Sequence, residues 1–211
     1  MIKHYINPQR DELPKVMINL LTDKGFDSKW VGGIQSLSGL EKELFRLIDA
    51  YQDDESGLKR IFHLIQIWGG YSGRGIYLSG DGFDWLSIQE PYATLVNTCI
   101  KTIDTSPNSI NRLVDAAKAF NLKVNNIGVS FISKHIRFWS YKNLGDMLLP
   151  VYDKVMFKAY LPYKKHININ QLGGYWRWAL NSLKKGQTLF QFEREVYNKN
   201  QIIMKKSQPV L

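Results

Sequence analysis

Lys134 and Asp153 are the residues of this chain whose types and surroundings suit covalent chemistry. Lys134 lies within the segment 128–135, and Asp153 follows the apolar segment 147–152. The neutral amine of a lysine is a nucleophile, and a carboxylate near the reacting atoms stabilises positive charge and assists proton transfer. Because lysines and acids are common in this chain, such a spacing also arises by chance, and the flanking residues must support the interpretation.

The segment before Lys134 predicts two helices joined by a short connection. Ser109 is expected to cap the first helix. The apolar face of that helix contains Ile110, Leu113, Val114, Ala117 and Phe120. The connection is expected over residues 121–130. Backbone N–H groups at the start of the second helix can hold a DNA phosphate without reading sequence, and Gly128 lets that backbone approach closely.

The capping pattern gives each candidate residue a position on a helix. Ser133 is expected to cap the second helix and to place Lys134 in its first turn, where the helix dipole lowers the pKa of an amine. Pro150 is expected to end the following segment, and Asp153 to cap a helix that begins at Lys154. That cap would fix the direction of the Asp153 carboxylate.

Helical patterning dominates the rest of the chain and predicts a mostly α fold. Further helices are expected at 13–21, 40–51, 58–68, 95–103, 153–160, 169–184 and 188–204. The segment Gly69–Gly82 contains six glycines. It predicts an irregular, functional loop with room for a short strand pair around residues 76–78.

The charge of the chain favours a polyanionic partner. The formal net charge is +9 and the pI is about 9.5, and basic side chains that neutralise phosphates gain affinity by releasing counterions. The excess of basic over acidic residues lies after Asp153 in the sequence, at Lys154, Lys158, Lys164, Lys165, Arg177, Lys184 and Lys185. Nucleic acid is therefore the leading candidate partner.

Length and composition indicate a globular protein. The 211 residues, 44% of them hydrophobic, are enough for a sizeable core. The apolar runs are too short for a membrane span, and the N-terminal residues lack the pattern of a secretory signal, so a cytoplasmic, nucleoid-associated location is expected. Cys99 is the only cysteine. It excludes an intrachain disulfide and is expected to be a small core residue.

Residues 109–160 resemble the helix-hairpin-helix DNA glycosylases, and most closely the bacterial 8-oxoguanine-glycosylase-like family. The resemblance is carried by Gly128, Phe131, Ser133, Lys134, Phe138 and Asp153. Ile132 stands where the better-known hairpin of the superfamily has a second glycine. The resemblance implies a single helical domain over residues 1–211, with two helical lobes around a cleft and a helix-hairpin-helix at about 109–140.

By this resemblance, the chain excises a modified base from double-stranded DNA. Lys134 would attack C1′ of a flipped-out nucleotide, while Asp153 would stabilise the developing positive charge on the sugar. Loss of the base would leave an abasic site. An imine on Lys134 would also permit strand cleavage by β-elimination.

Two further groups of residues are candidates for substrate contacts. Those expected to contact DNA are Gly128, Ser130, Ser133, His135 and Arg177. Those expected to line a base pocket are Trp68, Tyr71, Arg74 and Trp176, because aromatic rings stack on an extruded base. No metal or cofactor is expected, because the histidines lack metal-ligand companions at useful spacing. We expect a monomer.

The sequence leaves the substrate and the class of function open. The base is 8-oxoguanine in a repair reading, or a hypermodified phage base such as glucosylated hydroxymethylcytosine in an antiviral reading. A non-enzymatic helix-hairpin-helix DNA-binding module is the alternative from another class, with Lys134 as one phosphate contact among many.

Overall fold

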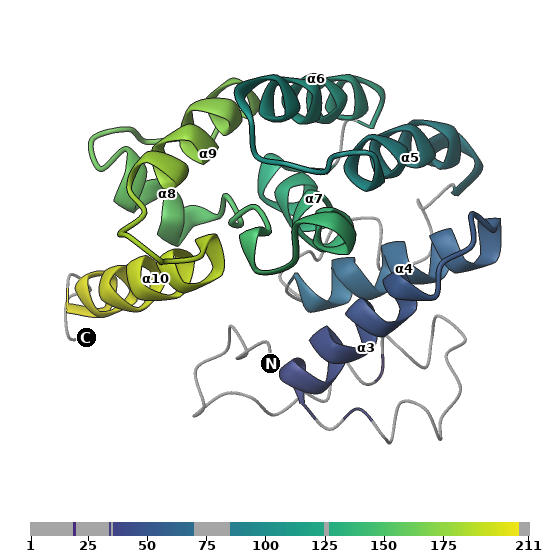
Figure 1. Ribbon diagram of the computed structural model, residues 1–211, viewed down its shortest axis with the longest axis horizontal. Helices are drawn as coiled ribbons and strands as arrows, with labels where there is room; N and C mark the ends of the chain where they lie inside the picture. The colour runs from purple at the N-terminus through teal and green to yellow at the C-terminus, as the bar shows by residue number, and fades with distance from the viewer. Residues whose placement is uncertain (1–18, 20–33, 35, 70–84, 125–126, 207–211) are drawn as a thin grey trace. The chain divides into compact units, whose positions relative to one another are not determined.

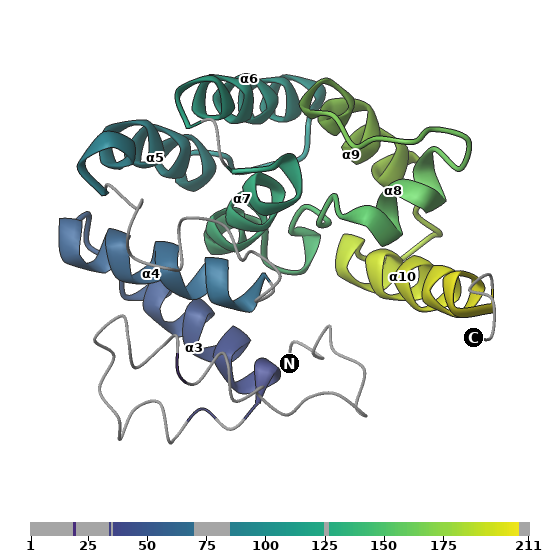
Figure 2. The same cartoon turned by 180° about the vertical axis from the view of Figure 1, so that it is seen from behind.

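The computed structural model of the chain describes residues 19, 34, 36–69, 85–124 and 127–206 (Figures 1 and 2). The described residues are mostly helical and contain no β-strand, which confirms the predicted fold class in its coarse form. The chain divides into two compact units, Met1–Ala93 and Thr94–Leu211. The candidate chemistry lies in the second unit.

The first unit contains α3 (Leu37–Asp49), α4 (Glu55–Trp68) and the start of α5 (Trp85–Ile100), which crosses the boundary between the units. α3 and α4 lie side by side in both views (Figures 1 and 2). The sequence predicts an apolar stripe on each of these helices. Leu47 and Tyr51 of the first stripe are half-buried, and the other predicted residues are buried: Leu40, Leu44, Ile48, Leu58, Ile61, Phe62, Ile65 and Trp68. α5 begins at Trp85 rather than at the predicted Leu95.

The second unit consists of helices of different lengths that bury several aromatic side chains. In chain order they are α6 (Pro107–Lys123), α7 (Val129–Leu144), η2 (Gly145–Met147), α8 (Lys154–Tyr160), η3 (Ile169–Gln171), α9 (Leu172–Asn181) and α10 (Leu189–Lys206). α10 packs against α8, and α9 packs against α6 (Figures 1 and 2). Gly173 permits the second contact, because a Cβ at that position would lie 3.1 Å from Val114 Cγ2.

The two helices predicted around the connection at 121–130 are present, but both begin earlier than predicted, and the connection is shorter because α6 ends at Lys123 and α7 begins at Val129. Ser106, not Ser109, caps α6 and accepts a hydrogen bond from Ser109 N at 3.3 Å. Pro107 occupies the first helical position, where a missing N–H costs nothing. α7 begins at Val129 after Gly128. Both predicted serine caps are therefore wrong, although the apolar face of α6 is buried as predicted.

Several predictions fall outside the described residues. The helix at 13–21, apart from Asn19, and most of the glycine-rich segment with its strand pair belong to this group. Within the described ranges, no helix is long and apolar enough to cross a membrane. Cys99 is fully buried, as predicted, and burial raises the pKa of its thiol.

Candidate functional site

Lys134 lies in the second turn of α7, with its amine directed back along the helix. Its Nζ makes a long contact of 3.5 Å with Ser130 Oγ and lies 4.3 Å from the centroid of the Phe131 ring. Only 9% of the residue is exposed. The amine therefore lies in a largely desolvated environment at the start of α7.

Burial lowers the pKa of the Lys134 amine, and the negative charge of Asp153 opposes the shift. The predicted direction of the shift is confirmed, but the predicted cause is wrong. A helix dipole acts mainly within the first turn, and Lys134 is the sixth residue of α7. Desolvation, which disfavours the ammonium, is the main cause.

Asp153 caps α8, as predicted. Its Oδ1 accepts hydrogen bonds from the backbone N–H groups of Val155 and Met156, both at 2.9 Å. Burial raises the pKa of the Asp153 carboxyl, against the lowering effects of the Met156 hydrogen bond and of the Lys134 charge. Within the described part of the chain, Oδ2 accepts no hydrogen bond, so the cap uses only one of the two carboxylate oxygens.

A buried hydrogen bond joins the two segments that carry Lys134 and Asp153. The Tyr152 N–H donates to Ser133 Oγ at 2.9 Å, and the same hydroxyl donates to Ser130 O at 2.8 Å. Ser133 immediately precedes Lys134, and Tyr152 immediately precedes Asp153. The bond thus brings together an amine and a carboxylate that are distant in sequence, close enough for each charge to shift the pKa of the other.

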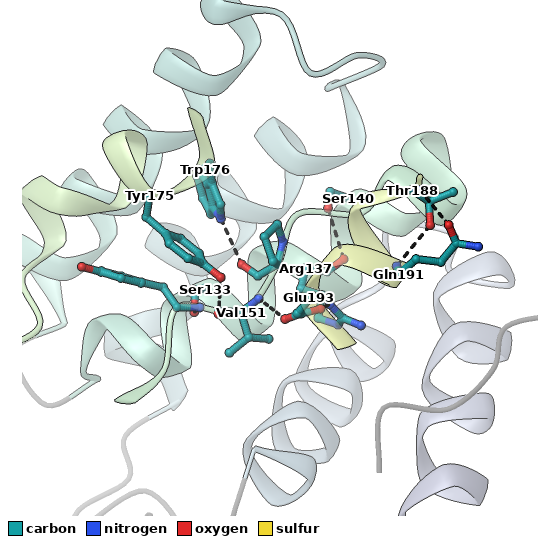
Figure 3. Close-up of polar contacts among 11 residues, drawn as sticks. Ser133, Arg137, Ser140, Val151, Tyr175, Trp176, Thr188, Gln191 and Glu193 are labelled. Carbon is teal, nitrogen blue, oxygen red and sulfur yellow. Dashed lines mark hydrogen bonds and ion pairs between the residues drawn. The ribbon is translucent and has the colours of Figure 1, made fainter. Parts of the chain in front are cut away.

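Side chains from three helices hold the segment that leads to Asp153 (Figure 3). Tyr175 Oη donates to Val151 O at 2.9 Å, and Trp176 Nε1 donates to Pro150 O at 3.1 Å, both from α9. Glu193 Oε1 of α10 accepts from Val151 N at 2.5 Å. With the bond from Tyr152 to α7, the backbone from Pro150 to Tyr152 is fixed by side chains rather than by a helix or sheet.

Glu193 belongs to a buried ion pair with Arg137 of α7 (Figure 3). Both side chains are fully buried. Burial raises the pKa of the Glu193 carboxyl to about 7, while the Arg137 guanidinium acts in the opposite direction. The pair therefore connects α7, which carries Lys134, to α10 and to the segment before Asp153.

The residues that the sequence predicts to contact DNA differ in their exposure to solvent. Ser133 and His135 are fully buried, and Ser133 Oγ already bonds to Tyr152 N, so the prediction that these side chains contact DNA is wrong. Gly128 is exposed, with open space where a Cβ would lie, and Ser130 is partly exposed. Arg177 is exposed, and its guanidinium donates to Asn111 Oδ1 at 3.1 Å.

Two of the four predicted base-pocket residues, Trp68 and Trp176, lie in the described part of the chain, one in each unit. Trp176 is fully buried and its indole N–H is used by Pro150 O, so the expected contact with a base is wrong for this residue. Trp68 is buried at the end of α4, in the first unit. Tyr71 and Arg74 lie outside the described residues.

The sequence interpretation missed the residues that support the site. Arg137 lies three positions after Lys134, and Glu193 stands beside the buried Phe192 on α10. A lone acid on an apolar helix face was the available signal for Glu193, because such a residue needs a buried partner. The supporting role of Tyr175 had no comparable signal, since core packing alone explains a buried tyrosine.

Replacing Ser133 by alanine is expected to destabilise the protein by about 1–3 kcal/mol, because the buried Tyr152 N–H loses its acceptor. Urea unfolding measures the effect as a lower midpoint with an unchanged m-value. Ser130→Ala is the matched control on the same helix, because its hydroxyl makes only the long contact to Lys134. Equal unfolding midpoints for the two variants would refute the role assigned to Ser133.

Among the described residues, no group of three or more His, Cys, Asp or Glu side chains is placed to hold a metal ion. Comparison with protein-family models, with curated proteins and with solved structures finds no significant match to this chain.

Proposed function

We propose that this protein is a DNA glycosylase that excises a modified base through Lys134 and Asp153. The observation that carries the proposal is the hydrogen bond from Tyr152 N to Ser133 Oγ, because these two residues immediately precede Asp153 and Lys134. The sequence resemblance assigns the same two residues to the reacting sugar. The helical fold class is compatible with the proposal. A cleft between two helical lobes, as such enzymes have, is part of what we propose.

The electrostatics of the pair suit the proposed reaction. A lowered pKa of Lys134 increases the fraction of neutral amine that can attack C1′. The Asp153 carboxylate, held by its cap at Oδ1, presents Oδ2 to the positive charge that develops on the sugar. Buried groups with shifted pKa values and a specific charge partner are frequent in active sites.

The N-terminus of α7 supplies the proposed phosphate contact. Backbone N–H groups at a helix N-terminus bind anions, and Gly128 leaves that position open. Ser130 lies in the first turn and is partly exposed. Ser130 would therefore contact the backbone of the strand that carries the flipped nucleotide.

Base release by the wild-type protein tests the proposal. The protein is incubated with duplexes containing 8-oxoguanine and with phage DNA containing glucosylated hydroxymethylcytosine, and abasic sites are counted. We expect abasic sites in one of the two DNAs. DNA binding without base release from either would refute both substrates and would favour the non-enzymatic binding module.

The rate of base release is expected to rise with pH. Lys134 must lose a proton to attack, and because burial lowers its pKa, the rise occurs below the ordinary lysine value of 10.5. Asp153 must be ionised, and because burial raises its pKa, the low-pH decline begins above the ordinary value of 3.8. Single-turnover rates of base release, measured across this pH range, show both the decline at low pH and the rise at higher pH. A rate that falls as the pH rises from the pKa of Asp153 to that of Lys134 would contradict the assigned roles.

A further inference from the structure

The chain between Asp153 and Glu193 has an unusual charge composition. Residues 154–192 contain seven lysines and arginines and no aspartate or glutamate. One of these seven charges is balanced within the protein, because Lys184 forms an ion pair with Glu195 at 2.7 Å. Two of the other six basic residues, Lys164 and Lys165, are adjacent in the loop between α8 and η3, residues 161–168, where they are exposed and form no ion pair with any described residue.

A tight turn at the start of this loop presents Tyr163 to solvent. The Lys164 N–H donates to Leu161 O at 3.1 Å, which closes a four-residue turn. Pro162 occupies its second position, where a fixed φ favours the turn. Tyr163 follows at the third position and is 96% exposed. Since the ring makes almost no contact with the protein, packing does not explain a large aromatic residue there.

Hydrogen bonds fix both ends of the loop. At its start, Lys158 Nζ donates to Lys164 O at 3.0 Å and makes a longer contact of 3.5 Å with Pro162 O. At its end, Gln171 Oε1 accepts from Asn168 N at 3.0 Å and from Tyr152 Oη at 2.9 Å. Through the Gln171 side chain, the second anchor connects the loop to Tyr152, the residue that precedes Asp153.

We propose that residues 161–168 form a DNA contact in which Tyr163 stacks on an unpaired base while Lys164 and Lys165 bind the adjacent phosphates. The inference rests on the proposed function in that DNA is the partner. An exposed ring on a hydrogen-bonded turn, with cations beside it, is an arrangement that binds single-stranded nucleic acid, because every base offers a face for stacking. Free lysines beside the ring supply the phosphate contacts.

The position of the loop sets where on the DNA this contact falls. Asp153 and the loop lie at opposite ends of α8, whose seven residues span about 10 Å. Successive phosphates of one strand are about 3.4 Å apart along a duplex. With α8 lying along the strand, Tyr163 would contact a base about three nucleotides from the excised one, and the loop would select DNA that is unpaired or distorted beside the modified base.

Binding of a non-reactive DNA tests this inference without requiring base release. Fluorescence anisotropy is measured with a duplex that carries a tetrahydrofuran abasic analogue and an unpaired base three nucleotides away, and with the same duplex fully paired there. Tyr163→Ala is expected to weaken binding of the first duplex about ten-fold, whereas Tyr163→Phe retains the ring and the affinity. The fully paired duplex is expected to be affected less.

The two lysines are tested through the salt dependence of binding. Lys164→Ala and Lys165→Ala are each expected to reduce the slope of log K against log salt by about 0.7–0.9. Lys142→Ala, an exposed lysine of α7, is the matched control and leaves the slope unchanged. Wild-type affinity and slope in the Tyr163→Ala and lysine variants would overturn the loop inference, even where base release is observed. Tight binding that depends on Tyr163, without base release from any DNA, would refute the glycosylase and leave the contact intact.

Discussion

Replacing Lys134 by glutamine is expected to abolish covalent trapping of the protein on DNA. Borohydride reduces the imine that a lysine nucleophile forms with C1′, and a glutamine amide forms no imine. Base release is expected to fall by on the order of a thousand-fold or more, as it does when other enzymes lose a nucleophile. The measurement is single-turnover base release, with gel analysis of the reduced protein–DNA adduct.

Stability separates this functional role from a structural one. Because burial lowers the pKa of Lys134, the folded protein holds the ammonium less favourably than the unfolded chain does. A neutral glutamine of similar length is therefore expected to leave the free energy of unfolding unchanged or higher. Lost activity without lost stability is the signature of a residue kept for function.

Two variants make the result decisive. Lys142→Gln makes the same change at an exposed position of the same helix, and is expected to keep both trapping and base release. Asp153→Asn keeps an oxygen that can cap α8 but removes the charge, so base release should fall about 10²–10⁴-fold with little change in stability. Trapping that persists in Lys134→Gln would assign the nucleophile to another residue.

The parts of the fold that could be predicted are those fixed by local pattern. The apolar stripe on α4 and the cap at Asp153 depend on residues within one or two turns of each other. The starts of α6 and α7 were predicted too late, because Ser106 and Gly128 compete with nearby serines for the same role. Such choices depend on tertiary contacts, which local propensity does not include.

The support of the candidate site could not be predicted, because it comes from residues distant in sequence. Ser133 fits a helix cap in sequence, yet its hydroxyl bonds to the N–H of Tyr152 across the fold. Trp176 and Arg177 are equivalent candidates on a helical wheel. The structure buries Trp176 because Pro150 O needs a donor there, and leaves Arg177 exposed. The sequence suggested the candidate pair, and the fold supplies the contacts that hold the segments around it.

Replacing Arg137 by methionine is expected to destabilise the protein by about 3–5 kcal/mol, the usual cost of removing one partner of a buried ion pair. The change leaves the Glu193 carboxylate buried without its cation, while Glu193 still accepts from Val151 N. Urea unfolding near pH 8 measures the loss. The segment before Asp153 is expected to loosen as well, so that base release falls even where the protein remains folded.

The dependence of this loss on pH identifies its cause. Folding raises the pKa of Glu193 above its ordinary value of 4.5, to about 7 in the wild type. Between those values the folded protein binds the proton more tightly than the unfolded chain, so this carboxyl lowers stability as pH rises. Without Arg137 the pKa rises further, and the destabilisation of Arg137→Met is expected to grow with pH and to shrink towards pH 4.5.

A double variant distinguishes the unpaired charge from lost packing. Arg137→Met combined with Glu193→Gln removes both charges and keeps a side-chain oxygen for the Val151 N–H. Because neutral replacements of a buried pair are often tolerated, we expect the double variant to be more stable than Arg137→Met alone. If the losses of unfolding free energy caused by Arg137→Met and by Glu193→Gln simply add in the double variant, and neither loss changes with pH, the pair contributes by packing alone. The electrostatic link between α7 and the Asp153 segment is then refuted.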